Sequence, residues 1–368
     1  MERILTAGPY VDETEIKYVL DAVKNGWGKN WNIYLKKFEE AFAKYVGVKY
    51  CMATSCCTGA LHLSLASLGI GPGDEVIVPD MTWIASATAI NYLGATPVFV
   101  DIKKEDWTVD PNEIEKAITK NTKAIIPVHM YGYPCDMEKI MEIAKKHNLH
   151  VIEDAAPAVG ATVNGKKVGS FGTFGCFSFQ GAKLLVTGEG GMLCTNDKEL
   201  FDKAHNLNDH GRDPNIMFWI NQIGYKYKMS NMQAAFGLAQ LEKIDYLIKR
   251  KREVYEEYCK QLKDIKEIEI YGKQENKKSI FWMTSILVKD ECKVNRDEIM
   301  KQLDEKYDVD SRPVFPKVSK FPMYKEVNNK VSDYVSKRAI NLPSSVILTK
   351  EEITRVCDGI KEIINGTK

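Results

Sequence analysis

The sequence predicts an α/β protein built on a mostly parallel sheet with helices on both faces, followed by a smaller α+β domain. Two observations lead to this fold class. Short runs of continuously apolar residues recur along the first part of the chain, and segments with helical periodicity separate them. Strands that are apolar throughout are buried on both faces, and strand–helix alternation is typical of parallel sheets.

Seven apolar runs are expected to form the strands of this sheet. They are residues 50–53, 75–78, 96–101, 124–128, 151–154, 174–179 and 192–195. Between them we expect helices at 12–25, 34–45 and 136–147, where apolar residues recur at helical spacing. A loop of small residues at 54–59 opens a further helix, and the stretch 79–94 is expected to form another.

The later part of the chain has a different organisation. Residues 231–262 form a long helical stretch, which the loop GYKYKMSN separates from the sheet region. Beyond it, expected strands at 268–271, 281–288 and 309–313 alternate with helices at 295–307 and 350–364. At 368 residues the chain exceeds one ordinary core. We therefore expect a large domain at 1–245 and a small domain at 246–368, with segment 1–30 packing on the small domain.

Composition limits the classes of function. The chain is 44% hydrophobic and 27% charged with a formal net charge of +1, as in a globular protein without a basic stripe. Nucleic acid and membranes are therefore not expected partners, since no apolar run is long enough to span a bilayer. Nine cysteines without framework spacing indicate reduced thiols and a cytoplasmic location. No metal site is predicted, because Cys56 and Cys57 are adjacent and not spaced like zinc ligands.

Lys183 is the most informative single residue. It lies between two apolar runs that are expected to be strands, in a loop that ends in GEGG, and aromatic and aliphatic residues surround it. A lysine held toward an apolar interior is desolvated, which lowers its pKa and makes the nucleophilic amine accessible, as in lysines that form Schiff bases. The alternative is a lysine that reaches solvent from a strand end.

Other informative residues follow the expected strands at the same edge of the sheet. They are Thr58, Gly59, Trp83, Asp154 and Ser178. Ligands of parallel sheets bind beyond the carboxyl ends of the strands, so these residues and Lys183 are predicted to form one site. The small-residue loop at Thr58 opens a helix, whose free N–H groups and dipole suit a phosphate, although a plain N-cap is the alternative.

Asp154 indicates which ligand the site would take. It ends an apolar strand with little polar company, so its carboxylate needs a cationic or N–H partner. The protonated ring nitrogen of pyridoxal phosphate (PLP) would supply one, and this pairing makes PLP an electron sink. Lys183 would then bind the aldehyde carbon, and Trp83 would offer a flat face to the ring. Taken singly, each of these residues also has an ordinary structural explanation.

The chain resembles the DegT/DnrJ/EryC1/StrS family of PLP-dependent sugar aminotransferases nearly from end to end. The motifs that carry the likeness are GALHLSLASLGIGPGDEVIVPDMTW, ATPVFVDI, TKAIIPVHMYG, VIEDAAPAVGA, FSFQGAKLLVTGEGGM, GYKYKMSNMQAAFGLAQLE and SRPVF. The resemblance implies fold type I, with a mostly parallel seven-stranded sheet, and transamination with PLP or its amine form, PMP. It also implies an obligate homodimer with shared active sites.

The family's functional residues fall on the residues named above. The resemblance implies that Lys183 is the Schiff-base lysine, that Asp154 partners the pyridine nitrogen and that Trp83 stacks on the ring. The residues that match the phosphate-binding set are Thr58, Gly59, Ser178 and, from the neighbouring subunit, Asn231.

Within the family, residues 216–242, 279–283 and 310–315 are most similar to GDP-perosamine synthases. Those enzymes transfer an amino group from L-glutamate to C4 of GDP-4-dehydro-6-deoxy-D-mannose. The implied substrates are therefore L-glutamate and a nucleotide-linked 4-keto-6-deoxy sugar, for surface polysaccharide biosynthesis. The candidate substrate-binding residues are Trp27, Lys226, Arg312 and Lys317.

Other functions remain open at this point. The acceptor could be a UDP- or dTDP-linked keto sugar or a small phosphorylated ketone. A PLP-dependent sugar dehydratase shares the fold, but such enzymes place histidine at the Schiff-base position, so Lys183 favours the transferase. A PLP-binding regulator without enzymatic activity is a further alternative.

The chain departs from the family pattern in three places. Pro157 replaces a residue that usually hydrogen-bonds near the PLP hydroxyl, and Cys57 replaces the glycine before Thr58. After SRPVF, the histidine-containing segment of perosamine synthases is replaced by PKVSKF, with Lys317 and Ser319. The third change bears on the identity of the sugar acceptor.

Overall fold

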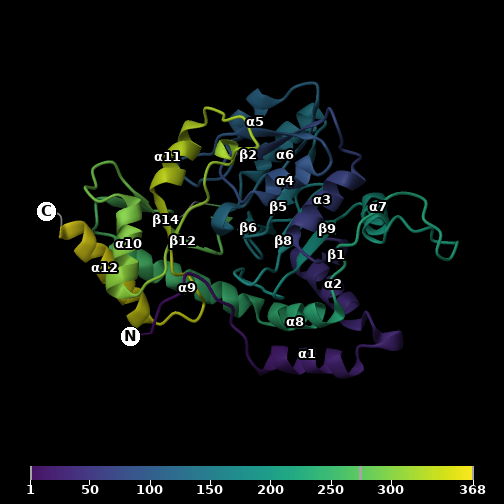
Figure 1. Ribbon diagram of the computed structural model, residues 1–368, viewed down its shortest axis with the longest axis horizontal. Helices are drawn as coiled ribbons and strands as arrows, with labels where there is room; N and C mark the ends of the chain where they lie inside the picture. The colour runs from purple at the N-terminus through teal and green to yellow at the C-terminus, as the bar shows by residue number, and fades with distance from the viewer. Residues whose placement is uncertain (1, 273–275, 367–368) are drawn as a thin grey trace.

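A seven-stranded sheet organises the larger part of the molecule (Figure 1). The computed structural model describes residues 2–272 and 276–366. The strand order is β1-β9-β8-β5-β4-β2-β3, and β9 runs antiparallel to both neighbours while the other adjacent pairs are parallel. The strands are β1 (Tyr50–Thr54), β2 (Glu75–Pro79), β3 (Thr96–Val100), β4 (Thr122–Ile125), β5 (His150–Asp154), β8 (Phe174–Ser178) and β9 (Gly191–Thr195). The predicted mostly parallel sheet of seven strands is confirmed.

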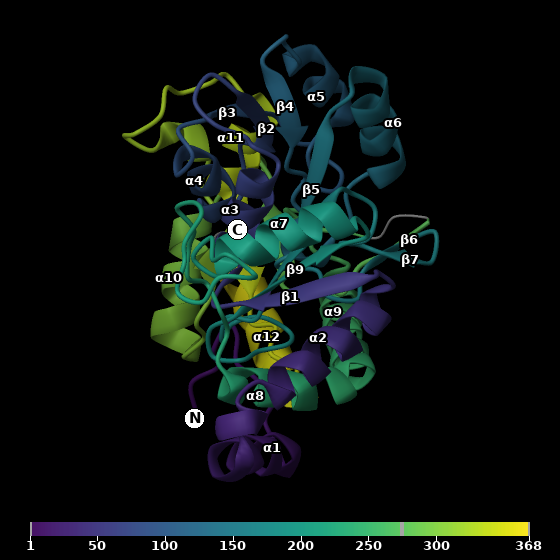
Figure 2. The ribbon, with the colours of Figure 1, turned by 90° about the vertical axis from the view of Figure 1, so that its right-hand side faces the viewer.

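Helices cover both faces of this sheet, because successive side chains of a strand point to opposite faces. In β8, the ring of Phe177 lies 5.0 Å from that of Phe42 in α2, whereas Cys176 lies 3.4 Å from Ser64 in α3. Figure 2 shows α2 and α8 on one side of β1 and β9, with α3 and α7 on the other. The helices are α2 (Ile33–Val46), α3 (Cys57–Ser67), α4 (Ala85–Asn91), α5 (Pro111–Ala117), α6 (Met137–His147), α7 (Lys198–Asn208) and α8 (Asn231–Glu242).

The smaller part is built on an antiparallel four-stranded sheet in the order β10-β12-β14-β13. Its elements are α9 (Ile244–Leu262), β10 (Ile268–Ile270), β12 (Thr284–Val288), α10 (Arg296–Tyr307), β13 (Arg312–Pro313), α11 (Lys330–Arg338), β14 (Ala339–Leu342) and α12 (Lys350–Asn365). The smaller part has a hydrophobic cluster of its own, which includes Tyr258, Leu303 and Ile360 and fills the space between this sheet and α9, α10 and α12. A three-stranded sheet of β6 (Thr162–Val163), β7 (Lys166–Lys167) and β11 (Lys277–Lys278) joins the two parts.

The N-terminal segment contacts both parts. Ile4 pairs with Val309 in a β-bridge, and the hydroxyl of Thr6 donates to Asp310 at 2.7 Å. Helix α1 (Glu13–Asn25) lies along α8, where the amide of Gln240 donates to Glu15 at 2.6 Å. The first residues therefore pack on the small part, and α1 packs on a helix of the large part. The division of the chain at residue 245 stays a prediction.

Some predicted elements have different bounds in the structure. The helical stretch 231–262 breaks at Lys243, which leaves the helical conformation and binds two carboxylates of the N-terminal segment. The predicted strand 281–288 begins late, at β12, because Phe281 has a φ of +49°. The helix predicted at 79–94 is confined to α4 and its last residues are a turn, which leaves the loop after β2 to line a cavity.

In the described part of the chain, the structure contains no helix that is long and apolar enough to cross a membrane. The same residues include no group of three or more His, Cys, Asp or Glu side chains arranged to hold a metal ion.

Candidate active site

A cavity of about 420 Å³ opens beyond the carboxyl ends of the parallel strands. This edge is where open α/β sheets bind their ligands, and the volume lies in the usual range for small-molecule sites. The residues that line it are Cys56, Cys57, Thr58, Leu61, Thr82, Trp83, Ala85, Val128, Met130, Asp154, Ala156, Pro157, Ser178, Gln180, Ala182, Lys183, Glu189, Trp282 and Phe315. Trp282 and Phe315 come from the smaller part, so both parts build the cavity.

The cavity brings together five side chains that the sequence predicted would converge. They are Thr58 in the first turn of α3, Trp83 before α4, Asp154 at the end of β5, Ser178 at the end of β8 and Lys183 between β8 and β9. The four strands that precede these residues end at one edge because they run in the same direction. Their roles in binding stay proposals.

Lys183 presents its amine to the cavity from the loop between β8 and β9. Its Nζ lies 3.6 Å from the centre of the Trp282 ring. Desolvation of the amine lowers the pKa of Lys183 to about 8, although the charge of Asp154 acts in the opposite direction. A part of the population therefore carries a neutral, nucleophilic amine at neutral pH, as the apolar sequence around this lysine suggested.

Asp154 faces the same cavity with few donors to balance its charge. Its Oδ2 accepts from the Ser86 hydroxyl at 2.7 Å and its Oδ1 from the backbone N–H of Ala156 at 3.1 Å. Burial nevertheless raises the pKa of this carboxyl. A cation placed in the cavity beside Asp154 would stabilise the carboxylate. The protonated ring nitrogen of PLP is such a cation, so the residues present fit that cofactor.

A second carboxylate holds the end of β5 in place. Glu153 points to the opposite face from Asp154, is fully buried, and accepts from three backbone N–H groups of the turn 169–172 at 2.6 to 2.8 Å. The ring nitrogen Nε2 of His129 lies 3.1 Å from the same carboxylate. The backbone N–H of His129 donates to the backbone carbonyl of Asp154. Sequence reasoning missed this support, although an acidic residue inside an apolar strand signals a paired, buried charge.

The aromatic rings of Trp83, Phe315 and Trp282 line one part of the cavity, and the buried ring of Tyr131 stacks on the last two. Trp83 and Phe315 have ring centres 5.6 Å apart, Phe315 and Tyr131 5.3 Å, and Tyr131 and Trp282 6.0 Å. The Trp282 indole donates to the carbonyl of Ala182 at 2.8 Å, which fixes its ring over Lys183. We call the four rings the aromatic wall. Of these four residues, only Trp83 was predicted from the sequence to bind the cofactor.

The opposite end of the cavity is the start of α3. Cys56 is the N-cap residue, and its sulfur accepts from the N–H of Gly59 at 3.4 Å. The first N–H groups of this helix and the hydroxyls of Thr58 and Ser178 can hold a phosphate there. Burial raises the pKa of the Cys57 thiol, so the residue that replaces a glycine is neutral and adds no charge to oppose the phosphate.

Gly59 also has a structural role that was not predicted from the sequence. A Cβ at this position would lie 2.8 Å from the ring of Tyr227. Glycine therefore lets the loop before α8 pack directly on the first turn of α3. The phosphate-binding role of Gly59 itself stays a proposal.

The remaining predicted residues lie outside the lining of this cavity. Trp27 is exposed and donates to the carbonyl of Val23, and Lys226 lies in the loop before α8. Asn231 begins α8, and its side-chain oxygen accepts from the N–H of Tyr34 at 2.9 Å.

Two of the three cations predicted to bind the substrate, Arg312 and Lys317, already have partners in the chain. Arg312 is exposed and forms an ion pair with Asp310 at 3.2 Å. Lys317 is buried, and its ammonium donates to the carbonyl of Val327 and pairs with Glu326 at 3.4 Å. Lys317 therefore stabilises its own segment, because its charge is compensated away from the cavity.

Comparison with known proteins places this geometry in context. The model of the DegT/DnrJ/EryC1/StrS aminotransferase family matches residues 9–361. GDP-perosamine synthases of Caulobacter vibrioides and Escherichia coli O157:H7 are 42% and 43% identical, covering 99% and 98% of this chain and 99% of each relative. A Streptococcus pneumoniae protein assigned as a sugar aminotransferase, solved in its PMP form, is 28% identical with a TM-score of 0.92, covering 99% of this chain and 98% of its own.

The lowered pKa of Lys183 can be measured in the cofactor-free protein. Pulse labelling with an amine-acylating reagent, followed by peptide mass spectrometry, should give a midpoint near pH 8 for Lys183. An ordinary exposed lysine titrates near 10.4. Lys251 is the control: burial lowers its pKa to about 7, but its ammonium donates to two backbone carbonyls, so it should stay unlabelled. A midpoint for Lys183 above pH 10 would show that its amine is not desolvated.

Proposed function

The chain belongs to the DegT/DnrJ/EryC1/StrS family of PLP-dependent aminotransferases, and we propose that it transfers the amino group of L-glutamate to C4 of a GDP-linked 4-keto-6-deoxy sugar. The observation that carries this proposal is the meeting of Lys183 and Asp154 in one cavity, on a chain 42–43% identical over its length to GDP-perosamine synthases. The product would be an amino sugar for a surface polysaccharide.

The cofactor would be held at both ends of the cavity. Asp154 would pair with the ring nitrogen, Trp83 would cover one face of the ring, and Thr58, Ser178 and the start of α3 would bind the phosphate. When bound, PLP supplies an electron sink that makes the hydrogen on the substrate carbon beside the nitrogen acidic.

Lys183 is the proposed acid and base. With a pKa of about 8, roughly a tenth of its amine is neutral at pH 7, and that fraction grows as the pH rises. The neutral amine can remove the proton from the α-carbon of L-glutamate. In the second half of the reaction, the amine would remove a proton from the amine-bearing carbon of the cofactor, and the resulting ammonium would donate that proton to C4 of the sugar. The Trp282 ring beside Nζ excludes water from this transfer. It can also stabilise the ammonium between the removal of the proton and its return.

The aromatic wall supports a sugar nucleotide as acceptor. Flat apolar faces suit the face of a sugar ring or a base, and three of the four rings, those of Trp83, Trp282 and Phe315, line the cavity. Arg312, exposed beside Asp310, remains the candidate for a pyrophosphate oxygen, which its planar fork could bind with two hydrogen bonds.

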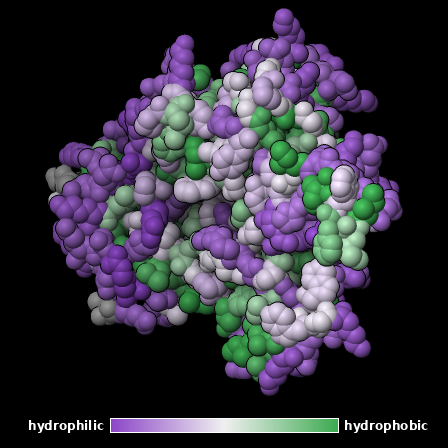
Figure 3. All heavy atoms as spheres, turned by 45° about the vertical axis from the view of Figure 1, so that its right-hand side comes forward, coloured by the Kyte–Doolittle hydropathy of each residue, from purple (hydrophilic) through white to green (hydrophobic). Residues whose placement is uncertain are grey.

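We also infer a homodimer with shared active sites. Apolar side chains gather in several places on the face that carries α1, α8 and the loop after α7 (Figure 3). In that loop Met217, Phe218 and Ile223 are 81%, 85% and 92% exposed, which is costly for a monomer in water. Asn231 lies outside the cavity of its own chain, and its amide nitrogen, 3.4 Å from the carbonyl of Gly26, is weakly held. That nitrogen can reach a neighbour's phosphate.

The acceptor can be identified by following the two half-reactions separately. L-glutamate should convert the cofactor to its amine form, with loss of its visible absorbance, and a GDP-linked 4-keto-6-deoxy sugar should restore that absorbance. We expect the GDP sugar to exceed UDP- and dTDP-linked sugars in kcat/KM by at least about tenfold. Lys183→Ala is the control and should give no multiple turnover. Recovery with a small phosphorylated ketone, and with none of the keto sugars, would contradict the proposed acceptor.

Shared sites can be tested by mixing two inactive variants. Lys183→Ala removes the acid and base, and Asn231→Asp puts a negative charge where the neighbour's phosphate would bind while it keeps an oxygen for the N–H of Tyr34. A heterodimer restores one of its two sites, so random mixing in equal amounts should recover about a quarter of wild-type activity. If subunits exchange and the mixture stays inactive, each chain builds its site alone.

A further inference from the structure

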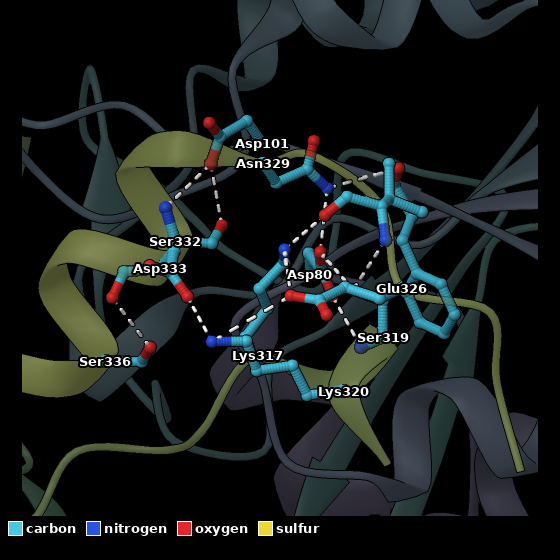
Figure 4. Close-up of polar contacts among 12 residues, drawn as sticks. Asp80, Asp101, Lys317, Ser319, Lys320, Glu326, Asn329, Ser332, Asp333 and Ser336 are labelled. Atoms are coloured by element: carbon cyan, nitrogen blue, oxygen red, sulfur yellow. Dashed lines mark hydrogen bonds and ion pairs between the residues drawn. The ribbon is translucent and has the colours of Figure 1, made fainter. Parts of the chain in front are cut away.

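A buried carboxylate at the end of β2 binds the segment that replaces the usual family sequence after SRPVF. Asp80 directly follows β2 and is fully buried. Its Oδ1 accepts from the Ser319 N–H at 2.7 Å, and its Oδ2 accepts from the Ser319 hydroxyl and the Asn329 amide, both at 2.8 Å. Figure 4 shows these three donors converging on Asp80. The large sheet thus holds a segment more than 230 residues away in sequence.

The backbone beside Asp80 makes the same connection. The Val318 N–H donates to the Asp80 carbonyl at 2.7 Å, and Met81 pairs with Lys317 in an antiparallel bridge. The chain after β2 and the chain after β13 therefore lie side by side at this point. Each of them supplies a ring to the aromatic wall: Trp83 on one side and Phe315 on the other.

A second carboxylate fixes the far end of the same segment. Asp101 follows β3, the neighbour of β2, and accepts from the N–H groups of Val331 and Ser332 at 2.9 and 2.8 Å and from the Ser332 hydroxyl at 2.7 Å. It therefore holds the first turn of α11 (Figure 4). Between the two carboxylates, Lys317 ties the loop to the carbonyl of Val327. The segment 317–332 is attached to the large sheet at both ends.

The chemistry of Asp80 makes this attachment sensitive to charge. Three N–H or O–H donors point at its two oxygens, which only a carboxylate can accept without reorientation. An asparagine would have the same shape, but its amide nitrogen would face a donor. One of the bonds to Ser319 or Asn329 would then be lost inside the protein, where an unmade hydrogen bond is expensive.

We propose that Asp80 is a positioning residue for the acceptor half of the reaction. It fixes residues 315–319 against the large sheet, so that Phe315 stands beside Trp83 at the place where a sugar nucleotide would pack. The identity of the acceptor rests on the proposed function. Asp80 does not line the cavity with Lys183 and Asp154, so the half-reaction with L-glutamate should not depend on it.

The test compares Asp80→Asn with a matched control. Asp106→Asn also removes one buried negative charge, but that carboxylate binds Lys103 at 2.7 Å and Lys277 at 3.2 Å, away from residues 315–319. Asp80→Asn should raise the KM for the keto sugar at least about tenfold and leave the rate of the L-glutamate half-reaction within about twofold. Asp106→Asn should change neither the KM for the keto sugar nor the rate of the L-glutamate half-reaction.

Hydrogen exchange gives a second readout that needs no acceptor. Amides of residues 314–327 should exchange at least about tenfold faster in Asp80→Asn than in the wild type, while the loop of Lys183 keeps its protection. Ser319→Ala removes one donor and is the milder variant if Asp80→Asn does not fold. It should shift both readouts in the same direction by about threefold.

Three results would overturn the inference: an equal fall of both half-reactions in Asp80→Asn, the same rise in KM in Asp106→Asn, or unchanged exchange of residues 314–327. A wild-type enzyme that uses no keto sugar would refute the proposed function instead. In that case faster exchange in Asp80→Asn still supports the positioning role, and unchanged exchange refutes it.

Discussion

The structure depends on an incomplete balance of charge between Asp154 and Lys183. Burial raises the pKa of the carboxyl and lowers that of the amine, and each group offsets part of the other's shift. A buried carboxylate that faces a partly neutral lysine has a free energy cost unless a cation lies beside it. A ligand with a positive ring nitrogen and a carbonyl carbon would satisfy both groups. The buried Glu153 and its partners hold Asp154 at the strand end despite that cost.

A lowered pKa alone does not identify the functional lysine. Burial lowers the pKa of Lys251 to about 7, further than that of Lys183. The two differ in surroundings: the Lys251 ammonium donates to the carbonyls of Trp282 and Ser344, whereas Lys183 faces a cavity. Lys251 therefore acts on the fold, and by holding the backbone of Trp282 it helps to place the ring that covers Lys183. Geometry, and not the pKa, separates the two lysines.

Local sequence pattern was enough to predict the sheet and the meeting of Asp154 and Lys183 at one edge of it. Continuous apolar runs marked the seven strands, and the common direction of β5 and β8 brought Asp154 and Lys183 to one edge. What the sequence could not reveal depends on contacts between distant segments. Tyr131 enters the aromatic wall through a left-handed backbone with a φ of +51°, and Phe315 through its N–H bond to the Tyr131 hydroxyl. The partners of Lys317, Glu326 and the carbonyl of Val327, depend on the folding of their loop, so the sequence could not show that its charge is compensated.

The central claim, that Lys183 is the residue that binds the cofactor, can be tested by trapping the bond. Sodium borohydride reduces a carbon–nitrogen double bond to a stable amine, so reduction of the PLP-loaded protein should attach a pyridoxyl group to one lysine. Peptide mass spectrometry should find that group on Lys183, in stoichiometric amount, and no such adduct in Lys183→Ala. A pyridoxyl group on Lys251 or on any other lysine would contradict the account.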